Sequence, residues 1–149
     1  MSHHVDVARA PAERRHVYGC PLRWSDMDAF GHVNNVVFLT YLEEARVDML
    51  FALDSPVRDL SEGVVVARHE IDYKRPLVYR PEPVRIETWV TRVGAASFDV
   101  AYEVRDDDDV YVRAASVLVP YAMDKARPRR ITPIERDFLS RFSVAGPDA

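Results

Sequence analysis

The sequence is poor in cysteine, has no excess of positive charge and contains no long apolar run. Its single cysteine, Cys20, rules out an internal disulfide framework and fits a reducing compartment, so we expect a cytoplasmic protein. No stretch reaches membrane-spanning length, and the first fifteen residues lack the apolar segment of a signal peptide. We therefore expect no membrane insertion.

The charge and the motifs that are missing exclude further classes. A formal net charge of -4 and a pI near 5.7 argue against nucleic-acid binding, which normally needs a strongly basic face. The sequence has no metal-ligand spacing, phosphate-loop glycine pattern or dinucleotide fingerprint, so it predicts no metal site and no cofactor. The four aspartates of 106–109 lack the spacing of a calcium loop and indicate a solvated turn.

What is present suits one domain of α+β class. With 149 residues and 48% hydrophobic content, the chain has room for a single core. Residues 1–15 are polar and predict a flexible leader, followed by one domain over 16–149. Strands are predicted at 16–24, 64–73, 84–93, 97–104 and 110–121, because β-branched and aromatic residues there alternate with polar ones.

Two helices are predicted. The first begins after a cap at Asn34 or Asn35 and runs to about Leu53; it is apolar on nearly all sides, so it must be mostly surrounded by protein. The second covers about 133–142, where Thr132 and Glu135 form a capping box. This order of elements predicts a long antiparallel sheet wrapped around a central helix.

Residues 26–46 (DMDAFGHVNNVVFLTYLEEAR) strongly resemble the acyl-CoA thioesterases of the hotdog superfamily, and most of all the 4-hydroxybenzoyl-CoA thioesterase-like branch. The resemblance continues through 71–77 (IDYKRPL) and 94–98 (GAASF) and covers roughly 16–130. One departure is Pro81-Glu82-Pro83, where relatives commonly have a Gly-Asp turn, and it leaves the shape of that predicted hairpin open.

The resemblance places the catalytic carboxylate at Asp28, acting as general base or as nucleophile, while Asp26 is interpreted as structural. Thioester hydrolysis also needs donors for the developing oxyanion. The free backbone N–H groups at the start of the long helix suit this role, and we expect them at Asn35, Val36 and Val37. Gly31 is expected to let the preceding loop approach the substrate carbonyl closely, with a backbone angle that a larger residue resists.

Other candidates are less specific. His32 is interpreted as an organiser of the loop, with direct catalysis as the minority alternative. Asn34 is expected as a cap or a substrate ligand, and Phe38 and Tyr41 as substrate contacts. Because the working acid of some hotdog thioesterases lies on the central helix, Glu44 is the fallback carboxylate; a partner for an arginine is its plainer interpretation.

Two basic runs can meet the phosphates of CoA. The first is Lys74-Arg75 and the second contains Arg127, Arg129 and Arg130. Arginine suits phosphate because its planar guanidinium donates two parallel hydrogen bonds. A solvated surface is an equally good interpretation of each run.

The predicted function is therefore hydrolysis of a fatty or aromatic acyl-CoA by a homodimer or tetramer, since the family's active sites lie between subunits. An acyl-carrier-protein thioesterase is the first alternative. A non-catalytic acyl-CoA-binding hotdog protein is the second, although such regulators carry a DNA-binding domain for which this chain has no room. Hotdog dehydratases fit less well, because their histidine segment has a different spacing.

Overall fold

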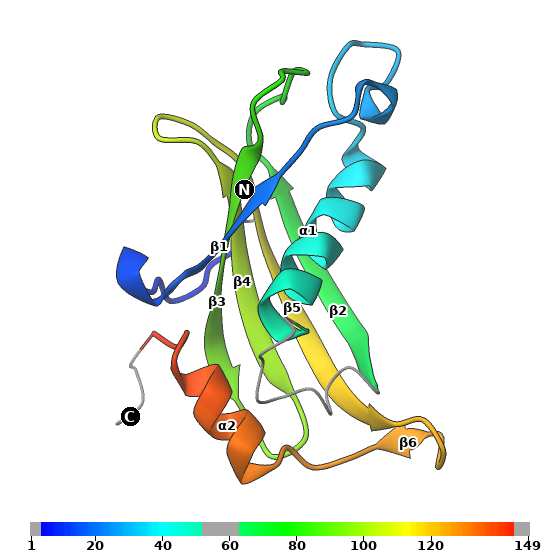
Figure 1. Cartoon of the computed structure of the whole chain (residues 1–149), viewed down its shortest axis with the longest axis vertical. Coiled ribbons are helices and arrows are strands. Elements are labelled where there is room, and N and C mark those ends of the chain that lie inside the picture. The colour runs from blue at the N-terminus through cyan, green and yellow to red at the C-terminus, as the bar shows by residue number, and fades with distance from the viewer. Residues whose placement is uncertain (1–3, 52–62, 145–149) are drawn as a thin grey trace.

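One curved antiparallel sheet carries the fold, in a computed structural model that describes residues 4–51 and 63–144 (Figure 1). The strands lie in the order β1, β3, β4, β5, β2, and the short β6 pairs with β5. Their bounds are β1 His16–Cys20, β2 Val64–Tyr73, β3 Val84–Val93, β4 Phe98–Arg105, β5 Val110–Ala122 and β6 Arg127–Pro128.

The alternating sequence pattern located the strands well. β2 and β3 have the predicted bounds, β4 is shifted by one residue at both ends, and β5 extends one residue further than predicted. β1 stops at Cys20 instead of continuing to residue 24, because Pro21 has no N–H to give to the ladder. A short 3-10 helix, η2 (Trp24–Asp26), begins at the last residue of the predicted strand.

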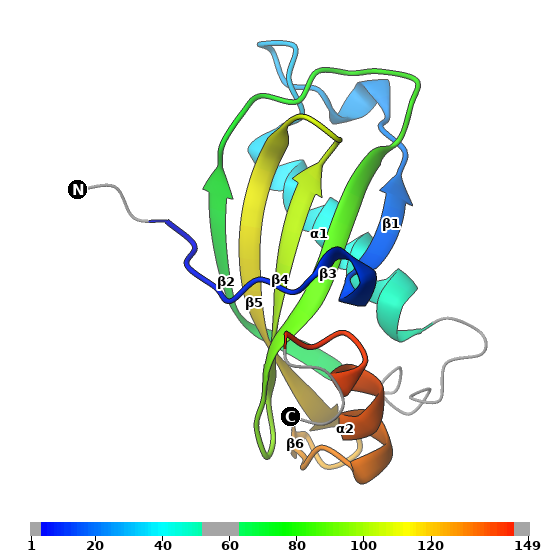
Figure 2. The ribbon, with the colours of Figure 1, turned by 90° about the vertical axis from the view of Figure 1, so that its left-hand side faces the viewer.

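The connection between β2 and β3 is not the hairpin that the sequence suggested. β2 and β3 are separated in the sheet by β4 and β5, so residues 74–83 cross over one end of the sheet (Figure 2). Arg80 holds this crossover: its guanidinium donates to the carbonyls of Glu82 and Pro83 and to Asp106 in the β4–β5 turn. The segment Pro81-Glu82-Pro83, which departs from the family pattern, therefore lies in a long connection that the hydrogen bonds of Arg80 hold in place.

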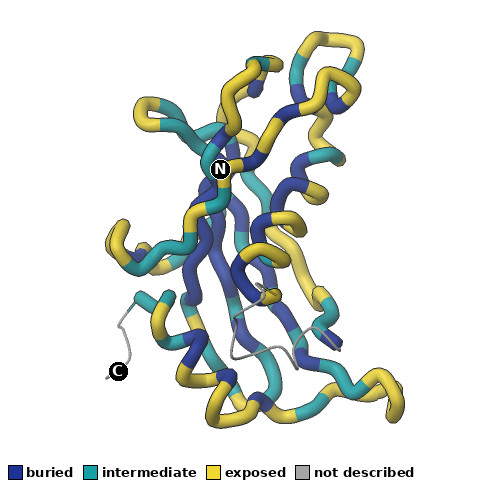
Figure 3. Tube along the Cα trace, in the orientation of Figure 1, coloured by how far each residue is buried: buried dark blue, intermediate teal, exposed yellow. Residues whose placement is uncertain are grey.

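Helix α1 (Asn35–Leu50) lies across one face of the sheet. Asn34 caps it, and the prediction that it continues to Leu53 falls partly outside the described residues. Its buried residues are Phe38, Tyr41, Leu42, Ala45, Met49 and Leu50. The opposite face stays open in the single chain, where Val36, Leu39 and Val47 are exposed (Figure 3). The expectation of a helix surrounded on most sides is thus wrong for one chain by itself.

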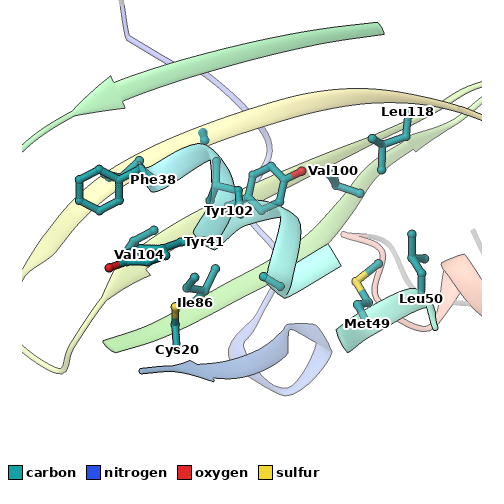
Figure 4. Packing of buried hydrophobic residues seen from close by; sticks show 14 of the residues in the cluster. Cys20, Phe38, Tyr41, Met49, Leu50, Ile86, Val100, Tyr102, Val104 and Leu118 are labelled. Atoms are coloured by element: carbon teal, nitrogen blue, oxygen red, sulfur yellow. The ribbon is translucent and has the colours of Figure 1, made fainter. Parts of the chain in front are cut away.

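The main core fills the space between α1 and the sheet. Figure 4 shows side chains of the helix, such as Phe38 and Tyr41, meeting those of the strands, such as Ile86 and Tyr102. Along β5 the buried residues are Val112, Ala114, Ser116, Leu118 and Pro120, which alternate with partly exposed ones. The period of two thus separates a helix-facing row from a row on the other face.

The N-terminal segment, residues 4–15, crosses the second face of the sheet (Figure 2). Ala10 packs with Trp89 and Ala101, and the Trp89 indole N–H donates to the Ala8 carbonyl at 2.9 Å. The sequence predicted a flexible leader here, and that prediction is wrong for residues 4–15. The prediction failed because the segment is polar, and its composition does not show that its charged residues hold it to the sheet.

Glu103 is the centre of that attachment. Its side chain is 1% exposed and accepts from Arg9 and Arg15 of the segment, at 2.7 and 2.9 Å, and from Arg105 and Arg113 of the sheet. Burial alone would raise the pKa of Glu103, but the hydrogen bonds and charge of Arg9, with Arg105 and Arg15, lower it to about 2. The carboxylate therefore stays ionised inside the protein.

A short helix completes the domain. α2 (Pro133–Ser140) has the predicted capping box of Thr132 and Glu135 and ends two residues earlier than predicted. None of the helices within residues 4–51 and 63–144 is long and apolar enough to cross a membrane. The α+β hotdog architecture, a curled antiparallel sheet packed on a central helix, is confirmed.

Replacing the buried carboxylate is expected to loosen the N-terminal segment. Glu103→Gln leaves the surrounding arginines without their common partner, so the free energy of unfolding should fall by about 3 kcal/mol at neutral pH. Because the pKa of Glu103 is lowered from 4.5 to about 2, its contribution is complete above pH 4.5 and is lost as the pH falls toward 2. Urea unfolding across this range should show the variant and the wild type converging in acid.

The matched control is Asp107→Asn, which removes an ion pair of the 91% exposed Asp107 with Arg85. An exposed pair contributes little, so this variant should stay within about 1 kcal/mol of the wild type. A Glu103→Gln variant as stable as this control at neutral pH would contradict the argument.

Candidate active site

The loop that precedes α1 is closed by Asp28. Its Oδ1 accepts the backbone N–H groups of Phe30 at 2.9 Å and His32 at 3.3 Å, and its own N–H donates to the His32 carbonyl at 2.8 Å. The other carboxylate oxygen, Oδ2, has no hydrogen-bond partner among residues 4–51 and 63–144. One carboxylate oxygen thus shapes the loop, and the other is left for a ligand.

Gly31 makes the tight turn of this loop possible. Its φ is +80°, in the left-handed region that L side chains rarely adopt. A Cβ built on Gly31 would meet nothing within 4 Å. The backbone angle that the sequence analysis expected for Gly31 is therefore confirmed.

The start of α1 supplies one free donor instead of three. The Asn34 side chain accepts the Val36 N–H at 3.1 Å, and the Asn34 carbonyl accepts the Val37 N–H at 2.9 Å. The predicted oxyanion donors Val36 and Val37 are thus engaged by the cap. The Asn35 N–H has no acceptor in the part of the chain that the structure describes. Asn35 therefore remains as the candidate donor at the positive end of the helix dipole.

Asp28 and Asn35 line the same pocket, of about 240 Å³. Its other polar lining residues are His32, Lys74 and Arg75, and its apolar wall is formed by Val33, Phe38, Tyr73 and Pro76. The loop and the crossover are joined there, since the Val33 N–H donates to the Leu77 carbonyl at 2.8 Å. The fold thus brings together Asp28, His32, Asn35, Phe38 and the first basic run.

Asp26 lies away from this pocket. Its side chain is 5% exposed, and Oδ2 accepts the Tyr41 hydroxyl at 2.7 Å and the Arg23 N–H at 3.2 Å. Burial and then the hydrogen bond to Asp26 raise the pKa of Tyr41. Tyr41 was predicted to contact substrate, but it is a core residue that does not line the pocket. Asp26 and Tyr41 together join the loop to the helix.

The remaining carboxylate and the thiol are also outside the pocket. Glu44 lies on the open face of α1 and is exposed. Burial, followed by the charges of Glu44 and Asp26, raises the pKa of Cys20 to about 12. Cys20 is therefore a protonated core thiol at neutral pH, unsuited to attack a thioester.

The second basic run lies at the opposite end of the sheet from the pocket. Arg127 belongs to β6, which lies beside α2 at the bottom of Figure 1, while the loop before α1 is at the top. The Arg129 guanidinium donates to both carboxylate oxygens of Glu135, at 2.9 and 2.7 Å, and so supports the capping box of α2. Within one chain, Arg127, Arg129 and Arg130 cannot serve the same ligand as Asp28, so that prediction is wrong for a single chain.

The sequence analysis missed three pocket residues, Val33, Pro76 and Tyr73, of which Tyr73 carries the polar group. It precedes Lys74 in the quoted segment IDYKRPL and follows Ile71 by two positions. Residues two apart on a strand face the same side, so the burial of Ile71 against the core could have signalled that Tyr73 also faces α1. Among the described residues, no group of three or more His, Cys, Asp or Glu side chains could hold a metal ion.

A protein-family model described as the thioesterase-like superfamily matches residues 22–142, which include the loop, helix α1 and strands β2 to β6. The chain belongs to this superfamily. Membership places it among thioester hydrolases, and the resemblance noted in residues 26–46 is confirmed at the level of the superfamily.

Solved structures agree with the family. A protein described as a predicted thioesterase from Bacillus stearothermophilus is 26% identical, with a TM-score of 0.77, over 87% of this chain and 96% of that one. A thioesterase from Thermus thermophilus, solved in complex with coenzyme A and Zn, is 28% identical with a TM-score of 0.74, over 87% and 93% of the two chains.

One curated protein is similar over a shorter stretch. YsmA of Bacillus subtilis (strain 168) is 35% identical over 81 residues, which are 54% of this chain and 54% of YsmA. The matched stretch therefore spans about half the length of this relative.

Substitutions of Gly31 in this thioesterase-family site should rank by how well each residue tolerates a positive φ. Gly31→Val should lower the free energy of unfolding by about 1–3 kcal/mol and reduce turnover, because the strained turn shifts the N–H groups that hold Asp28. Gly31→Asn should be milder, since asparagine adopts this conformation more readily. Thermal unfolding and thiol-release assays of both variants check the ranking, which equal losses for Val and Asn would contradict.

Proposed function

We propose that this chain hydrolyses acyl-CoA thioesters with Asp28 as the reacting carboxylate. The observation that carries the proposal is the placement of Asp28 and the Asn35 N–H on one pocket, each with a free polar atom. A carboxylate and a preorganised donor are the two groups that thioester hydrolysis needs. The superfamily match and the relative solved with coenzyme A support the choice of substrate.

The chemistry can follow two routes. As a general base, Asp28 takes a proton from water, and the hydroxide adds to the thioester carbonyl carbon. The C–S bond then breaks, and the CoA thiolate takes up the proton. As a nucleophile, Asp28 itself adds to that carbon and expels the thiolate, and water hydrolyses the resulting mixed anhydride. In both routes the negative oxygen forms beside the donor, so the Asn35 N–H and the helix dipole stabilise it.

The apolar wall and the basic residues of the pocket indicate where the two ends of the substrate would bind. Phe38, Val33 and Pro76 are suited to a fatty or aromatic acyl group, while Lys74 and Arg75 are suited to the phosphates of CoA. His32 is proposed as an organiser, because its backbone links the loop to Asp28 and to Val78 of the crossover.

We also propose that the working form is a homodimer joined through β2. This ten-residue strand is the outer strand of the sheet, next to β5 alone, and residues 66–70 along it are exposed. An unpaired edge of this length is a site for pairing with another chain. The open face of α1, with Val36, Leu39 and Val47 exposed, is a second surface that a partner would cover.

Asp28→Asn tests the reacting carboxylate. Asparagine keeps the Oδ1 acceptor that closes the loop, so stability should change little, whereas turnover should fall at least about 100-fold because the basic oxygen is gone. The measurement is colorimetric thiol release from a panel of acyl-CoAs, with a melting curve for each variant.

Two matched controls accompany it. Glu44→Gln should leave turnover unchanged, and Asp26→Asn should mainly lower stability, since Asp26 accepts the buried Tyr41 hydroxyl. Near-normal turnover of Asp28→Asn with an inactive Glu44→Gln would move the acid to the helix. Thiol release only from acyl-carrier-protein substrates would favour the carrier-protein alternative, and release from neither would favour a binding protein.

Recognition of the CoA phosphates is tested at Lys74 and Arg75. The double change to alanine should raise KM about 10-fold for acyl-CoA and much less for the same acyl group on pantetheine, which lacks the nucleotide, because an arginine or lysine contact to a phosphate is charge-assisted. Arg141→Ala is the matched control, since Arg141 is 55% exposed and lies at the end of α2, away from the pocket. Equal effects on both substrates would remove Lys74 and Arg75 from phosphate binding.

A further inference from the structure

Tyr73 connects the sheet to the first turn of α1. It is the last residue of β2, and its hydroxyl donates to the Asn35 carbonyl at 3.0 Å. The two residues are 38 positions apart in the sequence. Tyr73 also lines the pocket that contains Asp28 and Asn35. A strand residue therefore touches the backbone of the same residue whose N–H is the free donor.

The other backbone groups around that donor are already fixed. The Asn34 N–H donates to the Asp26 carbonyl at 3.0 Å, and the Asn34 side chain holds the Val36 N–H at 3.1 Å. These bonds restrain the donor from the loop side and along the helix. The hydroxyl of Tyr73 adds a restraint from the sheet side, on the carbonyl of Asn35 itself.

The ring of Tyr73 is held in place by packing. Its centroid lies 5.9 Å from that of Phe38, with 54° between the planes, and Phe38 in turn packs edge-on against the buried Tyr41. Burial raises the pKa of Tyr73, so the hydroxyl remains a donor at neutral and mildly alkaline pH. The contact to Asn35 therefore starts from an anchored aromatic ring and not from a freely rotating side chain.

We infer that Tyr73 is a positioning residue for the oxyanion donor: its bond to the Asn35 carbonyl holds the backbone of Asn35, so that the N–H on the other side of the Cα is directed at the thioester oxygen. The inference rests on the proposed function and extends it to a residue outside the loop and the helix. Geometry of this kind matters because a misplacement of about 1 Å at a reacting centre can cost 10²-fold in rate.

Tyr73→Phe removes the hydroxyl and keeps the ring. We expect kcat to fall about 10-fold with KM nearly unchanged, since the acyl wall is retained and only the transition state loses stabilisation. The matched control is Tyr79→Phe. Tyr79 is 42% exposed against 44% for Tyr73, lies in the crossover, and its hydroxyl has no hydrogen bond among residues 4–51 and 63–144. This control should keep the wild-type kcat.

Two inhibitors separate positioning from a general structural effect. A fluoroketone analogue of acyl-CoA presents an oxyanion-like oxygen to the donor, whereas a CoA thioether with the same chain has no carbonyl. Tyr73→Phe should weaken binding of the fluoroketone about 10-fold and leave the thioether unchanged. A purely structural role would weaken both or neither.

The outcomes of this experiment distinguish the two proposals. If the wild type is active and Tyr73→Phe keeps both its kcat and its fluoroketone affinity, the inference about Tyr73 is overturned while the proposed function stands. If the wild type releases no thiol from any acyl-CoA, the proposed function fails. The inhibitor comparison then still decides on Tyr73: selective loss of fluoroketone binding supports a directed donor, and no selective loss overturns it.

Discussion

The hydrogen bond from the Tyr41 hydroxyl to the Asp26 carboxylate fixes the loop that carries Asp28 to the helix that carries Asn35. Both groups are buried, and a buried bond to a charged acceptor stabilises more than one between neutral groups. The Asp26 carbonyl also accepts the Asn34 N–H, so one residue restrains the cap of α1 from both its side chain and its backbone. The acid and the donor can face one pocket only because these contacts set the distance between loop and helix.

Much of this arrangement could be predicted from local patterns. The alternation along 84–93 and the capping box at Thr132 follow from side-chain geometry over a few residues, and both are found at the predicted positions. The motif around Asp28 located the loop and the helix start. These features depend on residues that are neighbours in the sequence, so one sequence is enough to predict them.

The failures at the crossover and at the N-terminal segment share another cause, since each depended on contacts between distant residues. The local alternation of residues does not show which strands pair. Residues 74–83 were therefore interpreted as a hairpin, and the role of Tyr73 was missed. The N-terminal segment looked unstructured because its affinity for the sheet comes from Glu103, roughly 90 positions away. Val36 and Val37 were expected as donors because a free helix end has several, and only the geometry of the Asn34 cap shows that two are occupied.

The two faces of the sheet are stabilised by different interactions, and the candidate site lies at one end of the sheet. The helix face is apolar and close-packed, and the other face is held by ions around Glu103. The pocket that contains Asp28 lies at the end of the sheet, where the loop, the crossover and the start of α1 meet. At that end the exposed Val36 of the helix and the open edge of β2 adjoin the pocket residues Asn35 and Tyr73 in sequence. A second chain covering these surfaces would enclose the pocket, exclude water around the developing charge and strengthen the pull of the Asn35 N–H, so assembly and catalysis would depend on the same strand.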